Sequence, residues 1–224
     1  MQPDLIPGQY GTQLGGEQAV VQHQRVLRNT YFLLALSLIP TGIGALIGVN
    51  LNFGFMRASP IISSLVLLAV IYGMFFAIEK NRDSGLGVAL LLALTFFLGI
   101  LLGPILQVAG GLRNGGQLVA LAAGGTAVVF FAMAGIASVA KRDLSFMTNF
   151  LVLANFFFGS PVLSLTICAG FVLFSSLMIM WQVNQIVRGG ETNYISATLT
   201  LYMSIYNLFT SLLQLLMALT GNRD

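Results

Sequence analysis

The chain has 224 residues, of which 57% are hydrophobic and 8% are charged, against roughly 25% charged residues in an average soluble domain. Its net charge is +3, but the basic residues lie at the edges of apolar segments, so they indicate membrane flanks rather than a nucleic-acid surface. The composition therefore excludes a water-soluble globular protein and predicts an integral membrane protein whose main partner is the lipid bilayer.

The chain begins with a polar segment rich in Gly and Gln, which lacks the basic start and apolar core of a cleavable signal. We expect residues 1–27 to form a flexible cytoplasmic tail and residues 28–220 to form a transmembrane domain of several spans. Each apolar run predicts a helix, because backbone groups in lipid need internal hydrogen-bond partners. Seven such runs follow, at about 31–49, 61–78, 86–109, 118–140, 145–158, 162–187 and 195–219.

The fifth run is short for a full crossing. Residues 144–187 form 44 residues without a charge, which reach about 66 Å as helix, against about 60 Å for two passes of the hydrocarbon core. A turn at the Gly-Ser-Pro sequence at 159–161 would divide them into two crossings. The alternative is a re-entrant half-helix and six full spans; we favour seven.

Basic residues predict the orientation of the spans. With seven spans, one side of the membrane collects seven basic residues and the other collects three. The two groups are Arg25, Arg28, Lys80, Arg82, Lys141, Arg142 and Arg188 on one side, and Arg57, Arg113 and Arg223 on the other. This asymmetry predicts a cytoplasmic N-terminus and a C-terminus outside, although six spans would give the same counts.

Small residues four positions apart predict close contacts between helices, because hydrophobicity does not draw helices together in lipid and close backbone approach does. Glycines are also common in membrane helices without such a role. Three pairs have this spacing: Gly44 with Gly48, Gly99 with Gly103, and Ala120 with Gly124.

The apolar runs lack the groups that intramembrane chemistry requires. The single histidine, His23, lies in the tail, and the single cysteine, Cys168, lies in an apolar run where it would act as a small hydrophobic residue. We therefore expect no catalytic residues, no metal site and no cofactor, and we predict that the protein is not an enzyme. Glu79 is the carboxylate nearest to a span interior, and its basic neighbours favour a place at the membrane interface.

Five stretches of the sequence resemble the YccA-like branch of the Bax inhibitor-1 (TMBIM) family, from about residue 23 to the C-terminus. They are HQRVLRNTYFLLALSL at 23–38, LGPIL at 102–106, GGTAVVFF at 124–131, KRDLSFM at 141–147 and GGETNYISATLTLYMSIYNLF at 189–209. The resemblance implies an all-α bundle of seven transmembrane helices in the bacterial inner membrane, with the seventh helix near the centre. The fifth helix is about ten residues shorter here than the family pattern implies.

The resemblance implies two functions within this family. Some bacterial members are pH-sensitive calcium leak channels governed by a carboxylate pair on helices six and seven. YccA-type members are instead similar to one another as substrates and modulators (inhibitors) of the membrane AAA protease FtsH.

The positions of that carboxylate pair fall on Gln182 and Ser204, and Asn207 lies one helical turn after Ser204. None of these side chains titrates, so they cannot share a proton and switch a pore with pH. We expect them to form a polar cluster that hydrogen-bonds across helices, for about 0.6 kcal/mol each and up to about 2. We therefore favour a modulator of FtsH, with a calcium or cation leak channel as the alternative, and we do not expect calcium to be bound.

Overall fold

A computed structural model describes residues 7–139 and 164–221. Its elements are α1 (Pro7–Asn50), α2 (Gly54–Ala58), α3 (Pro60–Lys80), α4 (Gly85–Leu101), α5 (Gly103–Gly110), α6 (Gly115–Val139), α8 (Ser164–Arg188) and α9 (Tyr194–Gly221). The described residues contain no strand. Six spans among them are long and apolar enough to cross a membrane, which confirms an all-α membrane protein.

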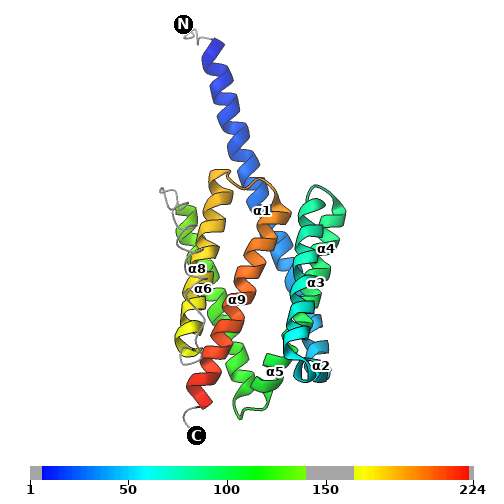
Figure 1. Cartoon of the computed structure of the whole chain (residues 1–224). Helices are drawn as coiled ribbons and strands as arrows, with labels where there is room; N and C mark the ends of the chain where they lie inside the picture. The colour runs from blue at the N-terminus through cyan, green and yellow to red at the C-terminus, as the bar shows by residue number, and fades with distance from the viewer. Residues whose placement is uncertain (1–6, 140–163, 222–224) are drawn as a thin grey trace.

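The fifth expected span, the short run at 145–158, lies outside the described residues, as do Lys141 and Arg142. Its neighbours α6 and α8 run in the same direction, and the two chain termini lie at opposite ends of the bundle (Figure 1). The end of α6 and the start of α8 therefore lie at opposite ends of the bundle, and the count of seven spans stays a prediction.

The run at 86–109 is two helices rather than one. The chain bends at Leu102, between α4 and α5, where Gly103 and Pro104 follow. Pro104 has no backbone N–H to donate, so it suits the first turn of a new helix. The Leu102 N–H still bonds to the carbonyls of Leu98 and Gly99, so the backbone remains paired inside the membrane.

Most of the N-terminal segment that we predicted as a flexible cytoplasmic tail belongs to helix α1, and its flexibility and cytoplasmic side stay predictions. Helix α1 begins at Pro7, so residues 7–27 continue the first span as helix and project beyond the bundle (Figure 1). The reason is local: no proline separates Pro7 from the apolar run, and a formed helix adds each further residue at little cost. The predicted boundary at residue 27 is therefore not a change of secondary structure.

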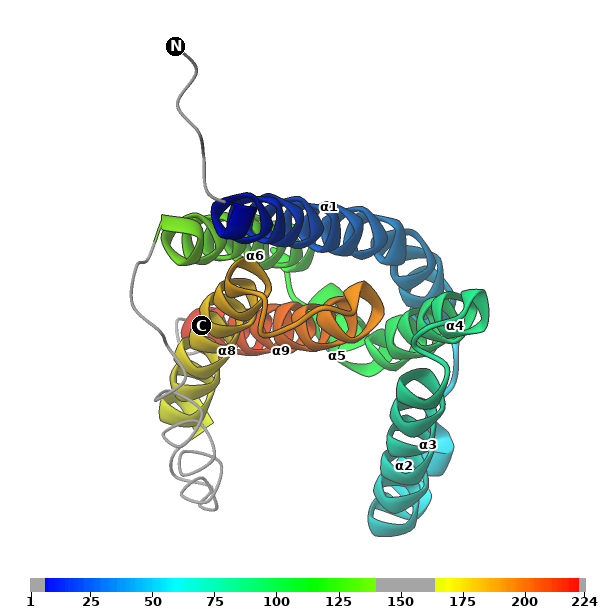
Figure 2. The same ribbon diagram turned by 90° about the horizontal axis from the view of Figure 1, so that it is seen from above.

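Helix α9 lies at the centre of the bundle, as the family resemblance implied. Seen from above, α1 and α6 lie on one side of it, α8 on another, and α4 beyond its start (Figure 2). Helix α3 packs on α4 at the periphery. Five of the largest fully buried side chains belong to α9: Ile195, Leu201, Tyr202, Leu208 and Leu213.

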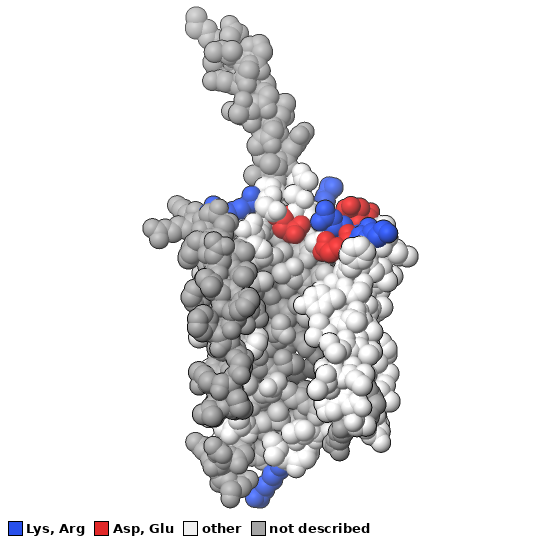
Figure 3. Space-filling model, in the orientation of Figure 1, with Lys and Arg blue, Asp and Glu red and all other residues white. Residues whose placement is uncertain are grey.

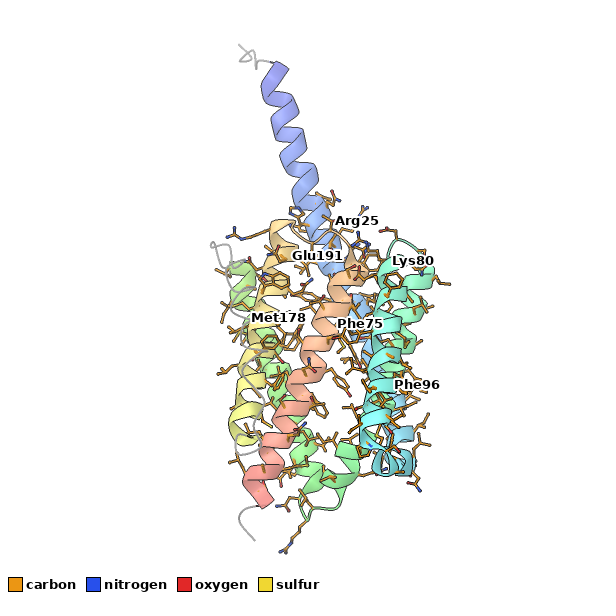
Figure 4. The ribbon with its side chains drawn as sticks, in the orientation of Figure 1. Arg25, Phe75, Lys80, Phe96, Met178 and Glu191 are labelled. Carbon is orange, nitrogen blue, oxygen red and sulfur yellow. The ribbon has the colours of Figure 1, made fainter. Side chains whose placement is uncertain are left out.

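Charged side chains gather at one end of the bundle, the end from which α1 projects (Figure 3). Arg25, Lys80 and Glu191 lie there together (Figure 4), and among the described basic side chains Arg113 follows α5 at the opposite end. This end is named the charged end below. By the distribution of basic residues it is the predicted cytoplasmic side.

Two of the three predicted small-residue pairs meet each other across one interface. A Cβ added to Gly44 would collide with the backbone of Phe96, and one added to Gly48 with the backbone of Ile100. From the facing helices, Gly99 of α4 lies against the carbonyl of Thr41 and Gly103 of α5 against the carbonyl of Gly48. Both pairs therefore allow α1 to pack backbone against backbone on α4 and the start of α5.

The third pair lies elsewhere. Ala120 and Gly124 are exposed, and among the described residues nothing lies within 4 Å of a Cβ built on Gly124. The packed face of α6 is instead that of Leu118, Ala122 and Thr126. Spacing alone does not tell which face of a helix its neighbours cover, and the contact predicted for the third pair stays a prediction.

Candidate functional site

The polar side chains of α9 mostly bond to their own helix. The Ser204 hydroxyl donates to the carbonyl of Thr200 at 2.9 Å, and the Thr200 hydroxyl donates to that of Ser196 at 3.2 Å. Such bonds to the preceding turn satisfy a hydroxyl in an apolar medium without a partner helix. The Thr198 hydroxyl also reaches another helix and lies 3.3 Å from the carbonyl of Thr30 in α1.

Gln182 and Ser204, onto which the family resemblance places the acid pair, lie on α8 and α9. These helices pack directly against each other, and the two residues are 3% and 5% exposed. Asn207 is half-buried one turn further along α9. The site is therefore buried and polar, but Ser204 bonds within its helix instead of across to α8 as expected.

No carboxylate approaches this depth among the side chains that the structure describes. The described acids beyond residue 20 are Glu79, Asp83 and Glu191, and the acidic side chains in view lie at the charged end (Figure 3). Two uncharged groups at buried positions cannot carry the shared proton of a carboxylate pair. The described core therefore has no group with which to switch between charge states near neutral pH.

Glu79 lies at the rim, at the end of α3. Its carboxylate accepts a hydrogen bond from the Ser196 hydroxyl at 3.0 Å and lies 3.6 Å from the Arg82 guanidinium. The Glu79 side chain is 44% exposed. It therefore ties α3 to the start of α9 at the membrane interface, and it does not reach the span interior.

The Gly-Gly-Glu-Thr-Asn segment before α9 joins the start of that helix to the α3–α4 turn at the charged end. The Asn193 amide oxygen accepts the backbone N–H groups of Ile195 and Ser196, and so caps α9. The amide nitrogen of Asn193 donates to the Asp83 carboxylate at 2.8 Å and to the Arg82 carbonyl at 3.0 Å. One side chain thus starts the central helix and anchors it to the α3–α4 turn.

Several buried polar groups, three of them on α8 with Gln182, were not predicted from the sequence. Asn184 has no exposed surface, and its amide nitrogen and oxygen have no hydrogen-bond partner among the described residues. The same holds for the Thr30 hydroxyl, the Ser175 hydroxyl and the Trp181 indole N–H. An unpaired buried polar group costs about 1–3 kcal/mol. The available signal was a second amide two residues after Gln182 in an apolar run.

Two tyrosines connect α9 to its other neighbours. The Tyr202 hydroxyl lies 2.7 Å from the Thr41 hydroxyl of α1 and 3.4 Å from the Thr95 carbonyl of α4. The Tyr206 hydroxyl donates to the Leu98 carbonyl at 3.3 Å. These bonds cross between helices, which is the role the sequence suggested for Ser204 and Asn207.

The site as a whole offers structural bonds and no reactive constellation. Within the described residues, no three His, Cys, Asp or Glu side chains come together as a metal site would require. Most of the hydroxyls named above bond to carbonyls, that of Ser196 bonds to the Glu79 carboxylate, and those of Thr30 and Ser175 have no partner among the described residues. The arrangement can hold helices together and keep a polar core.

A family match and several similar proteins agree on the family of this chain. Residues 23–221 match the sequence family described as "Inhibitor of apoptosis-promoting Bax1". An uncharacterised protein of Neisseria meningitidis is 47% identical over 213 residues, covering 90% of this chain and 94% of its own. A protein of Escherichia coli K12 named "Modulator of FtsH protease YccA" is 39% identical over 210 residues, covering 88% and 92%. Its counterpart in a second E. coli strain is named "Inner membrane protein YccA".

Proposed function

Because the chain belongs to the Bax inhibitor-1 family, we propose that it is a substrate and modulator of the membrane AAA protease FtsH in the bacterial inner membrane. The observation that carries the proposal is its 39% identity, over 88% of its length, to a protein named a modulator of that protease. The match extends over the spans and includes the connecting segments, so it concerns the whole bundle.

The N-terminal part of α1 supports this role. It projects beyond the bundle at the charged end (Figure 1), which is the predicted cytoplasmic side. An ATP-driven protease needs an accessible segment to grip before it pulls a substrate from the membrane. Residues 1–22 supply such a segment, because they contain only two charges, Asp4 and Glu17.

The bundle behind this segment resists extraction. The first span is held to α4 by backbone contact at Gly44 and Gly48 and to the central helix by the Tyr202–Thr41 bond. Pulling α1 out therefore breaks the tightest helix contact and the link to α9 together. A substrate that is gripped readily and unfolded slowly would occupy the protease, which is how we propose that it inhibits the degradation of other proteins.

Deleting residues 1–22 tests the proposal. The truncated protein should show a longer half-life than the full chain in membranes that contain active FtsH, and it should lose its inhibition of a second FtsH substrate. A control chain in which residues 1–22 are replaced by an uncharged Gly/Ser segment of equal length should be degraded like the parent. An unchanged half-life after truncation, with the bundle still folded, would contradict the proposal.

The cation leak is tested separately. We expect proteoliposomes of the parent to show little difference in calcium flux between pH 6 and pH 8, because neither Gln182 nor Ser204 changes charge in this range. The double variant Gln182→Asp, Ser204→Asp restores two carboxylates at these buried positions and provides the comparison. A strong pH-switched flux in the parent, unaffected by Gln182→Ala, would favour a channel gated elsewhere.

A further inference from the structure

A hollow of 840 Å³ lies between α1, α6 and α9. Within the described residues, no Cα of α1 lies within 8 Å of a Cα of α6. The ring of Tyr31 meets that of Phe130 edge-on with centroids 6.0 Å apart, and so joins the two helices by side chains alone. The two helices are thus the walls of a groove whose floor is α9, and the name α1–α6 groove is used for it below.

The α1–α6 groove has the lining of a site for an apolar molecule. Small residues such as Gly42 on α1 and Gly135 on α6 give it width, and aromatic side chains such as Phe131 and Phe209 give it contact surface. Its volume falls within the range of about 300–1,000 Å³ that small-molecule sites occupy. This volume is too small for a further transmembrane helix, whose diameter with side chains is about 10–12 Å.

The α1–α6 groove runs along the spans and opens toward the bilayer. Its lining on α6 extends from Val119 to Ser138, which corresponds to about 28 Å of helix, close to the thickness of the hydrocarbon core. Phe131 and Leu38 at its walls are 70% and 52% exposed. The medium at its mouth is therefore hydrocarbon, and an acyl chain matches its length and polarity.

Arg28 marks the charged end of the α1–α6 groove. It precedes the lining residues Tyr31 and Ala35 by three and seven positions, so it shares their face of α1. Arg28 is exposed, and no ion pair to it is found among the described residues. Arg25, three residues earlier, instead borders a separate hollow with Thr192 and Tyr194. One unpaired cation therefore lies where a lipid phosphate would lie if its acyl chain entered the groove.

We propose that the α1–α6 groove is a lateral binding site for an anionic glycerophospholipid, with an acyl chain between α1 and α6 and the phosphate at Arg28. The bound lipid fills the space between the backbones of α1 and α6, which do not come within 8 Å of each other in the described residues. The proposal does not depend on the protease role, because it concerns the bundle and not its N-terminal segment.

Tryptophan quenching by brominated lipids tests the proposal in proteoliposomes. The background variant is Trp181→Phe, which removes the single native tryptophan, whose N–H has no partner among the described residues. Phe131→Trp then places a reporter in the groove, and Phe76→Trp places one on α3, where Phe76 is 72% exposed, far from the groove lining. The probes are brominated phosphatidylglycerol and brominated phosphatidylcholine, each at low mole fraction.

We expect the reporter at position 131 to be quenched about fivefold more effectively by the anionic lipid, which corresponds to about 1 kcal/mol for one basic side chain at an anionic lipid. Arg28→Gln should remove this preference, while Arg25→Gln, with the same charge change beside the separate hollow, should leave it. The reporter at position 76 should show no more than a weak preference. Gly135→Leu, whose side chain would enter open space in the groove, should reduce quenching by both lipids at position 131.

Three results would overturn the proposal. Equal quenching by the two lipids at position 131 would mean that the groove only faces bulk lipid. Absence of quenching there would mean that protein covers the groove. An equal loss of preference in Arg25→Gln and Arg28→Gln would mean that the general charge of this end attracts anionic lipid without a defined site.

Discussion

Two faces of α1 both carry glycines, but one face packs closely against a neighbouring helix and the other borders an open groove. On one face Gly44 and Gly48 bring α1 into backbone contact with α4, and on the other Gly42 lines the open α1–α6 groove with nothing within 4 Å of an added Cβ. The partner makes the difference. Helix α4 presents Gly99 and the start of α5 presents Gly103 in return, whereas large side chains of α9, among them Tyr202 and Tyr206, line the space between α1 and α6. A small residue permits close approach, and the facing surface decides whether it happens.

The largest effect is expected from leucine at the closed face. Gly48→Leu should lower the free energy of unfolding in detergent by at least about 3 kcal/mol. Overpacking already costs about 1–3 kcal/mol when side chains can adjust, and here the collision is with the backbone of Ile100. Gly42→Leu, one and a half turns away on the open face, should change it by less than about 1 kcal/mol. Equal losses in the two variants would remove the distinction between the faces.

Removing the hydroxyl pair between Tyr202 of α9 and Thr41 of α1 should have an intermediate effect on the free energy of unfolding. Tyr202→Phe and Thr41→Val each remove one partner of the 2.7 Å hydroxyl pair. A double-mutant cycle on unfolding should give a coupling energy of about 0.6–2 kcal/mol, the range for hydrogen bonds between membrane helices. Tyr206→Phe with Thr41→Val is the control pair and should be nearly additive, because Tyr206 bonds to Leu98 instead. Additivity in the first cycle would mean that the floor does not hold α1.

The smallest effect is expected at the third small-residue pair. Gly124→Leu lies on an exposed face of α6 with open space around it among the described residues. The free energy of unfolding should therefore change by no more than about 0.5 kcal/mol, as for most exposed substitutions. Gly99→Leu provides the contrast, because a side chain there would collide with the backbone of Thr41. A loss at Gly124 as large as at Gly99 would place another helix against this face of α6.

The charged end and the span interior differ in how far their polar contacts can be predicted from the sequence. At the rim, Asp83 accepts a hydrogen bond from Asn193, and Glu79 accepts one from Ser196 and forms an ion pair with Arg82. The charged and amide residue types at this end predict such contacts from the sequence. Asn184, deep in an apolar run, has no such neighbour in sequence, and its burial was not anticipated. Polar residues near a span end can be interpreted locally, whereas a polar residue inside a span requires knowledge of which helix faces it.

The amino-acid sequence by itself determined the membrane class, the approximate limits of the six described spans, the end of the bundle that carries the charge and the family. The family resemblance also led to the prediction that Gln182 and Ser204 stand at the acid-pair positions. These are local properties, because about 20 apolar residues suffice to favour the hydrocarbon core whatever surrounds them. Only the tertiary structure decided that Gly44 and Gly48 meet Gly99 and Gly103, that Ala120 and Gly124 meet no described partner, and that α1 and α6 enclose a groove. Each of these depends on the faces that two distant helices present to each other, and helical spacing describes one helix at a time.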